Sequence, residues 1–267
     1  MILTSENYYS PEANMEYLSV SQFKDFVGTY GQAGCEAHAL AKAKGEWQDE
    51  PTPALLVGSY VDAYWDGSLE SFKQRHPEIF TKQGQLKADF RQADKIIERT
   101  LRDQKFCQYM SGQKQVIMTA EVFGAPWKIK IDSYHPCAGI VDLKVMKSIF
   151  KQEWVKDLGH LEFIRYWGYD VQAAVYQEVV YKNTGKRLPF FIAAVTKSDH
   201  PAIRVIQVPQ NWLDEALAMV EAYTPRIVAI KKGEIEPIRC EKEDCHYCCD
   251  TYVIDKPIMA TDLMEVT

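Results

Sequence analysis

The stretch from residue 121 to residue 150 limits the fold more than any other part of the sequence. Two short runs rich in β-branched residues, 128–133 and 139–145, flank a polar turn that contains proline, a pattern typical of a β-hairpin. Asp142 and Lys144 are two residues apart on the second run, so their side chains share one face. Asp132 ends the first run and can lie beside them across the ladder. The sequence therefore predicts two carboxylates and one ammonium group at the end of a small sheet.

This set of side chains suits a divalent cation. Mg²⁺ prefers carboxylate oxygens, and a nearby lysine can orient or activate a water molecule. An isolated D-x-K pair is more commonly a solvated strand edge, but a second motif lies downstream. Gln172 and Tyr176 are spaced i and i+4 in a segment, 160–183, that has helical apolar spacing and stops before Gly185. The two side chains are therefore expected on one face of a helix.

An aspartate, a D-x-K strand and a Q-x-x-x-Y helix in this order resemble the PD-(D/E)-x-K nucleases of the RecB type, most closely the phage and prophage RecE-like exonucleases. The resemblance implies an α/β core like that of restriction endonucleases, with a mixed central sheet flanked by helices. It also implies a DNA exonuclease, dependent on Mg²⁺ or Mn²⁺, that acts on the ends of linear double-stranded DNA in phage-type recombination or repair. A RecT-like single-strand annealing protein is the partner that the resemblance implies.

The resemblance also assigns roles to the motif residues. Asp132, Asp142 and the backbone carbonyl of Leu143 would hold the metal, and Lys144 would position the attacking water. On the helix that follows, the DNA backbone or the lysine would be oriented by Gln172 and Tyr176. A catalytically silent DNA-binding or structural module of the same fold is the alternative, although a decayed site usually loses one of these residues.

Two further acidic residues are candidate metal ligands. Glu121 precedes Asp132 by one predicted strand, and its alternative role is that of an exposed strand-end residue. Asp62 follows Gly58 by four residues in a predicted helix, 54–66. Many RecB-type nucleases have a histidine at the corresponding position, so this chain departs from that pattern. A ligand and a surface or capping role for Asp62 both remain open.

The rest of the sequence fits one nuclease domain over residues 1–267. Residues 1–16 carry no periodic pattern and are expected to form a loose arm or a short edge element, and a helical region follows at about 17–110. We expect strands at about 114–123, 126–133, 139–146, 188–196 and 203–208, and a closing helix at 211–232. A cysteine-rich tail, about 234–267, is expected to pack against the N-terminal helical region.

Four of the seven cysteines lie between positions 240 and 249. Cysteines this dense are more often metal ligands than disulfide partners inside the cell. Cys240, Cys245 and Cys248 supply three thiolates, and Cys35 is a candidate for the fourth. RecB-type nucleases with iron–sulfur clusters place one early and three late cysteines in this way, so the resemblance implies a [4Fe–4S] cluster that joins the two ends of the chain. A structural Zn²⁺, with His246 as a substitute ligand, is the rival hypothesis, and a redox or zinc protein built on the cysteines would leave the hairpin unexplained.

Composition excludes some classes of protein. The net charge of −6 argues against a protein that coats nucleic acid indiscriminately, because phosphate binding needs clustered lysine and arginine. It does not exclude a nuclease, whose acidic metal ligands offset a local basic groove. No apolar run approaches the ~18 residues that a bilayer span needs, and no signal pattern opens the sequence. We therefore expect a cytoplasmic protein without a membrane association.

Overall fold

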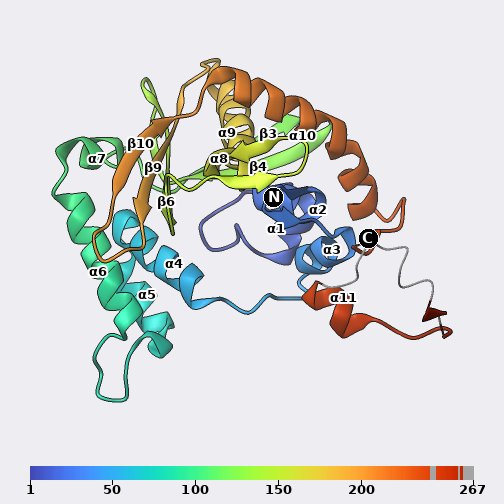
Figure 1. Ribbon diagram of the computed structural model, residues 1–267. Coiled ribbons are helices and arrows are strands. Elements are labelled where there is room, and N and C mark those ends of the chain that lie inside the picture. Colours follow the sequence, from blue (N-terminus) through green and yellow to red (C-terminus); the bar gives the residue numbers. More distant parts are fainter. Residues whose placement is uncertain (241–244, 258, 261–267) are drawn as a thin grey trace.

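A mixed four-stranded sheet forms the centre of the protein in a computed structural model, which describes residues 1–240, 245–257 and 259–260 (Figure 1). The strand order is β10-β9-β6-β5. The two central strands, β6 (Gly139–Met146) and β9 (Phe190–Thr196), run parallel. Antiparallel neighbours flank them: β5 (Ser133–His135) pairs with β6, and β10 (Ile203–Gln207) pairs with β9. The sheet and its flanking helices confirm the expected mixed α/β class.

A long hairpin leads into this sheet. Its strands are β3 (Val116–Val122) and β4 (Ala125–Ile131), and only Asp132 separates β4 from β5. The two turn residues, Phe123 and Gly124, both have positive φ values of 52° and 72°. A two-residue turn of this kind matches the right-handed twist of the paired strands, which fixes the register of the hairpin.

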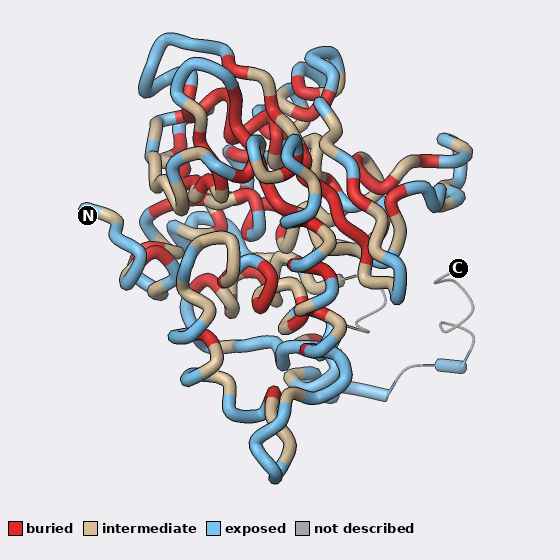
Figure 2. The backbone as a smooth tube through the Cα atoms, turned by 90° about the vertical axis from the view of Figure 1, so that its left-hand side faces the viewer, coloured by how far each residue is buried: buried red, intermediate tan, exposed pale blue. Residues whose placement is uncertain are grey.

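Helices cover both faces of the sheet. On one face lie α9 (Tyr169–Thr184) and α10 (Gln210–Lys231), and on the other lie α4 (Pro53–Asp66) and α6 (Ala88–Leu101) (Figure 1). Strand alternation divides the buried side chains accordingly. Ile140 of β6 belongs to the core beneath α9, whereas Val141 and Leu143 belong to the core beneath α4 and α6. Buried residues accordingly run through the middle of the molecule, and exposed ones gather at loops and ends (Figure 2).

The remaining elements are short and surround these layers. In the N-terminal half they are α1 (Pro11–Glu16), α2 (Val20–Val27), β1 (Gly28–Thr29), β2 (Gln32–Ala33), α3 (Glu36–Lys44), α5 (Leu69–Arg75), the 3₁₀ helix η1 (Pro77–Ile79) and α7 (Gln104–Tyr109). In the C-terminal half they are β7 (Glu153–Val155), β8 (Gly159–Leu161), α8 (Phe163–Tyr166) and α11 (His246–Thr251). The last helix, α11, packs against α3 near the start of the chain.

The expected helix over 160–183 is wrong in its first third. Residues 159–161 form β8, a single short helix follows, and α9 begins only at Tyr169. Gly168 has a φ of 62° at the junction, and this left-handed conformation ends α8 and turns the chain into α9. The apolar spacing misled the prediction because Phe163 and Ile164 are buried in the same core as α9.

Residues 1–16, here called the arm, end in a defined helix, α1. Ser10 caps it by accepting a hydrogen bond from the Ala13 backbone, and Pro11 occupies its first turn. Across the described ranges, none of the helices combines the length and the apolar character that crossing a bilayer requires.

Candidate active site and cysteine cluster

Asp142 and Lys144 lie on the face of β6 that looks toward α9. The Asp142 side chain is buried, and its Oδ2 lies 2.5 Å from Lys144 Nζ. Burial alone would lower the pKa of Lys144, but the Asp142 carboxylate outweighs it and holds the pKa above the usual range. The lysine is therefore a fixed positive charge inside the site at neutral pH.

Asp132 reaches the same point from the neighbouring strand. Strand β5 pairs with β6 only as far as Val141, so the edge of β6 beyond that residue is open. The backbone N–H of Leu143 donates there to Asp132 Oδ2 at 2.9 Å. Burial and the Asp142 charge together raise the pKa of Asp132 to about 7. Two carboxylates are thus held beside one another at this edge of the sheet.

Asp62 supplies a third carboxylate from α4. Its side chain is exposed and lines the same cavity as the other two acids. Desolvation by the surrounding protein, and then the charge of Asp132, raise its pKa well above the ordinary value. Three carboxylates that line one cavity form a place where a cation would relieve charge repulsion.

The donor atoms suit a hard divalent cation. Asp132 and Asp142 offer carboxylate oxygens, and Asp62 is within electrostatic range of both. The N–H and C=O groups of one strand residue point to the same edge of a sheet, so the Leu143 carbonyl faces the edge at which its N–H meets Asp132. These are the oxygen types that Mg²⁺ or Mn²⁺ takes. The residues present therefore fit the metal that the motif implies.

Helix α9 places Gln172 and Tyr176 against this site. Gln172 Nε2 donates to Asp142 Oδ1 at 2.6 Å, and the Tyr176 hydroxyl donates to the Lys130 backbone carbonyl at 3.1 Å. Ala173 and Ala174 are fully buried between them, and their small size lets the helix approach the strands closely. Gln172 thus orients the metal-site carboxylate, while Tyr176 ties α9 to β4.

Glu121 is not part of the site, contrary to its candidacy. It is exposed and pairs with Pro126 near the turn of the β3–β4 hairpin. Asp132 follows Ile131, which pairs with Val116 at the opposite end of the ladder. Five residues of strand separate the two ends, about 17 Å at the usual rise per residue. The prediction failed because a hairpin brings the end of its second strand back to the beginning of its first.

Two side chains near the lysine were not predicted from the sequence. The Tyr169 ring centroid lies 4.9 Å from Lys144 Nζ and 5.3 Å from Lys24 Nζ, so the ring is close to both cations. Burial, and then the charge of Lys144, lower the pKa of Lys24 to about 8. Tyr169 precedes Gln172 by three residues on one helix face, and this spacing is the signal that could have identified it.

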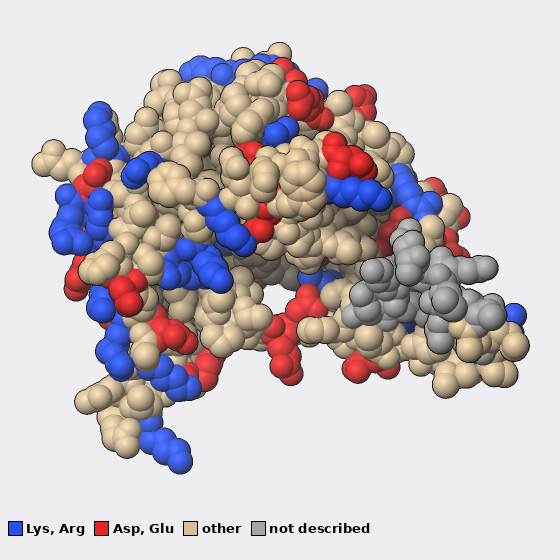
Figure 3. All heavy atoms as spheres, viewed as in Figure 1, with Lys and Arg blue, Asp and Glu red and all other residues tan. Residues whose placement is uncertain are grey.

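These side chains surround one cavity of about 450 Å³. Its walls come from β4, β6, α2, α3, α4, α9 and the arm. Basic and acidic side chains lie around a hollow near the centre of the view in Figure 3. The acids gather where β6 and α4 face each other, and Lys128 and Lys130 of β4 lie toward the arm. The cavity thus has an acidic end for a cation and a basic wall.

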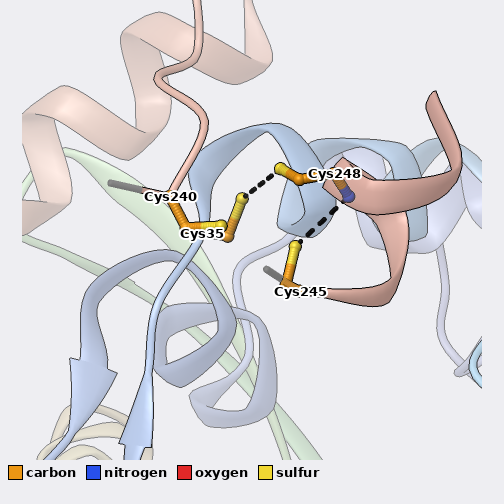
Figure 4. A group of neighbouring side chains, drawn as sticks. All are labelled: Cys35, Cys240, Cys245 and Cys248. Carbon is orange, nitrogen blue, oxygen red and sulfur yellow. Dashed lines mark hydrogen bonds between the residues drawn. The ribbon is translucent and has the colours of Figure 1, made fainter. Parts of the chain in front are cut away.

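The four predicted cysteines form a second constellation. Cys35, Cys240, Cys245 and Cys248 turn their sulfur atoms toward one another (Figure 4), and all four sulfurs lie within 4.8 Å of one another. The Cys35 and Cys248 sulfurs are 3.5 Å apart, although 213 positions separate the residues. Cys35 lies at the start of α3, and Cys245 and Cys248 lie at the start and in the middle of α11. The cluster therefore joins the two helices.

The orientations of neighbouring side chains explain why Cys249 and His246 are not part of the four-cysteine cluster. Cys248 is completely buried, whereas Cys249 is exposed because adjacent helix residues point in different directions. His246 is also exposed and stands outside the four-sulfur group among the described residues. Burial raises the pKa of the Cys35 and Cys245 thiols, so a metal bound here must displace protons.

Comparison with known proteins agrees with this geometry. A family model described as a PDDEXK-like domain of unknown function (DUF3799) matches residues 19–251, which include both constellations. A crystal structure of a candidate exonuclease from Eubacterium rectale has 60% sequence identity, covers 98% of each chain and gives a TM-score of 0.95. A search of curated proteins found no match. The chain belongs to the PDDEXK-like family.

Proposed function

We propose that the protein is a Mg²⁺-dependent DNA exonuclease that acts on the ends of linear double-stranded DNA, as the RecE-like members of the RecB-type nucleases do. The observation that carries the proposal is the meeting of Asp132, Asp142, Lys144 and Gln172 around one cavity. The likeness to the Eubacterium rectale protein supports an exonuclease over other uses of the fold. Mn²⁺ would substitute for Mg²⁺ at the same oxygen ligands.

The metal would be held by Asp132, Asp142 and the Leu143 carbonyl, and Asp62 would contribute a carboxylate from α4 across the cavity. When bound, Mg²⁺ polarises the phosphoryl oxygen and lowers the pKa of a coordinated water. Lys144 is charged, with its ammonium fixed by the Asp142 carboxylate and by the face of the Tyr169 ring. It positions the attacking water and stabilises negative charge on the phosphoryl group in the transition state.

Charge around the cavity suits a polyanionic substrate despite the acidic chain. Lys24, Lys130 and Lys144 all line the cavity, and only Lys144 has a carboxylate ion partner among the described residues. The other two cations remain to contact phosphate groups of a DNA strand. Local positive charge of this kind is compatible with a net charge of −6.

The test is the digestion of an end-labelled linear duplex in Mg²⁺, beside a covalently closed circle of the same sequence. The wild-type protein should release nucleotides from the linear DNA and leave the circle intact. Asp142→Ala should abolish the release of nucleotides. Asp199→Ala, which removes an exposed carboxylate in the loop between β9 and β10, should not. Binding without cleavage in wild type would instead indicate a catalytically silent module, and cutting of the circle would indicate an endonuclease.

A RecT-like single-strand annealing protein is the partner that we propose. End digestion exposes a single strand, and such a protein would load on it. When the purified annealing protein is added to wild-type enzyme and two duplexes with overlapping ends, joined molecules should accumulate. With the Asp142→Ala variant they should not form. Joining at equal yield with the inactive variant would contradict the coupling.

For the cysteine cluster we propose a single structural metal centre that joins α3 to α11. Four sulfurs at 2.3 Å from a tetrahedral Zn²⁺ would lie about 3.8 Å apart, close to the spacing here, whereas a [4Fe–4S] cubane inserts four iron atoms and needs wider separation. The spacing therefore favours Zn²⁺ over the cluster that the RecB-type resemblance implies. Protein purified without oxygen should be colourless with one zinc per chain; brown protein with four irons would reverse this assignment.

A further inference from the structure

The arm forms a wall of the cavity that the catalytic motifs do not use. Tyr8, Tyr9 and Asn14 line the cavity, facing β4. The arm is anchored there by a buried lysine: Lys128 Nζ donates to the Tyr8 carbonyl at 2.5 Å and to Asn14 Oδ1 at 2.8 Å. Lys128 is only 1% exposed and also lies 4.7 Å from the centre of the Tyr8 ring. The position of the arm is therefore fixed by contacts with β4.

Strand β4 leads from the arm to the acidic end of the cavity. Lys128, Lys130 and Asp132 alternate along the chain, so they share one face and all line the cavity. Lys130 is thus about 7 Å along the strand from Asp132, next to the metal site but outside it. Among the described residues, Lys130 Nζ has no carboxylate ion partner. Its charge is available to an anion that enters the cavity.

Tyr9 stands beside that charge. Lys130 Nζ lies 4.6 Å from the Tyr9 ring centroid, and the ring meets Tyr8 edge-on at 4.9 Å between centroids. Tyr8 is 5% exposed, whereas Tyr9 is 67% exposed although it borders the cavity. An exposed aromatic ring that contacts a cation and a second ring still has surface left for stacking on a base. A free cation and an open aromatic surface together match a nucleotide: a phosphate for the first and a base for the second.

We propose that Tyr9 and Lys130 form a subsite for the nucleotide next to the cleaved bond. Lys130 binds the phosphate that neighbours the scissile one, and the Tyr9 ring stacks on the base of that nucleotide. Stacking of this kind accepts any base, so the subsite holds the strand without selecting sequence. The inference rests on the proposed nuclease function and specifies how that site holds its substrate.

The test compares two substrates of the same metal site. Linear DNA uses the subsite, but bis(p-nitrophenyl) phosphate is a small diester without a neighbouring nucleotide. For Tyr9→Ala, the ratio of kcat/KM on DNA to that on the small diester should fall about tenfold, mainly through KM. Tyr9→Trp should restore the ratio because stacking is kept. Lys130→Gln should lower the ratio similarly. The affinity of this variant for DNA should also depend less steeply on salt concentration than that of wild type.

Matched controls remove side chains of the same two types at other exposed positions. Tyr30→Ala deletes another exposed tyrosine, and Lys95→Gln deletes an exposed lysine of α6. Neither should change the ratio. A Tyr9→Ala ratio equal to that of wild type, or an equal fall for Tyr30→Ala, would overturn the subsite.

A second measurement decides the subsite even if the protein does not cleave DNA. A short oligonucleotide with 2-aminopurine at a terminal position loses fluorescence when that base stacks on an aromatic ring. Without Mg²⁺, the wild-type protein and Tyr9→Trp should quench this fluorescence at saturation, whereas Tyr9→Ala should not. If the wild-type protein does not cleave DNA, or if Asp142→Ala cleaves it equally well, the proposed function fails. The quenching measurement then still tests the subsite. Equal quenching by wild type and Tyr9→Ala would refute the subsite whatever the activity.

Discussion

The substitution Asp132→Asn should inactivate the site and also stabilise the metal-free protein. Asp132 is partly exposed to the cavity, and desolvation by the surrounding protein together with the Asp142 charge raises its pKa to about 7. Asparagine has the same shape, and its side-chain carbonyl can still accept the hydrogen bond from the Leu143 N–H. The change therefore removes a disfavoured charge while it keeps the local structure.

The pH dependence gives the magnitude. An unfolded aspartate has a pKa of about 3.9, so the folded protein binds more protons than the unfolded chain between about pH 4 and pH 7. The free energy of unfolding therefore falls as pH rises through this window, and the loss is complete above pH 7. Three pKa units at ~1.36 kcal/mol each set an upper limit of about 4 kcal/mol. Because neighbouring charged groups share the titration, we expect a gain of about 2 kcal/mol for Asp132→Asn at pH 8 and almost none at pH 4.

Urea unfolding in the presence of a chelator measures this gain. Mg²⁺ added to wild type should raise its midpoint and close the gap, because a ligand that binds only the folded state stabilises it. Asp142→Asn is the contrasting variant: it leaves the buried Lys144 ammonium without its carboxylate and should cost about 3 kcal/mol. A chelated Asp132→Asn protein that is less stable than wild type at pH 8 would refute the reasoning.

Three further outcomes follow from the contacts. Lys144→Ala should lower the rate of Mg²⁺-dependent DNA digestion about a thousandfold with an unchanged circular dichroism spectrum, and wild-type-like digestion would exclude its role. Gln172→Ala should lower kcat about tenfold by releasing Asp142 Oδ1, and Gln172→Glu should lower it further through charge repulsion, as initial rates will show. Cys248→Ser should lose the bound metal and lower the melting temperature, whereas Cys249→Ser should change neither in metal analysis and thermal unfolding.

Short-range sequence patterns were enough to predict how much of the catalytic motif is arranged. Asp142 and Lys144 share a face because a strand alternates its side chains, and Gln172 and Tyr176 share one because a helix repeats nearly every four residues. These relations depend on a few consecutive residues, so they can be read from the sequence. The parallel arrangement of β6 and β9 likewise needs a crossover between them, and α9 supplies it.

Tertiary structure decided which distant residues join these motifs. Glu121 and Asp62 were both candidate ligands from the sequence. The β3–β4 hairpin places Glu121 away from the site, whereas the packing of α4 places Asp62 at the cavity. The meeting of Cys35 with the late cysteines was expected only by resemblance, because nothing in local spacing relates residues 213 positions apart.

The position of the arm could not be predicted from the sequence either. Residues 1–16 have no periodicity that could indicate a cavity wall, and their position depends on Lys128 contacting Tyr8 and Asn14 from β4. Such contacts form because a buried ammonium must be paired with hydrogen-bond acceptors. The sequence alone contains the lysine and its acceptors, but only the folded chain determines which of them meet.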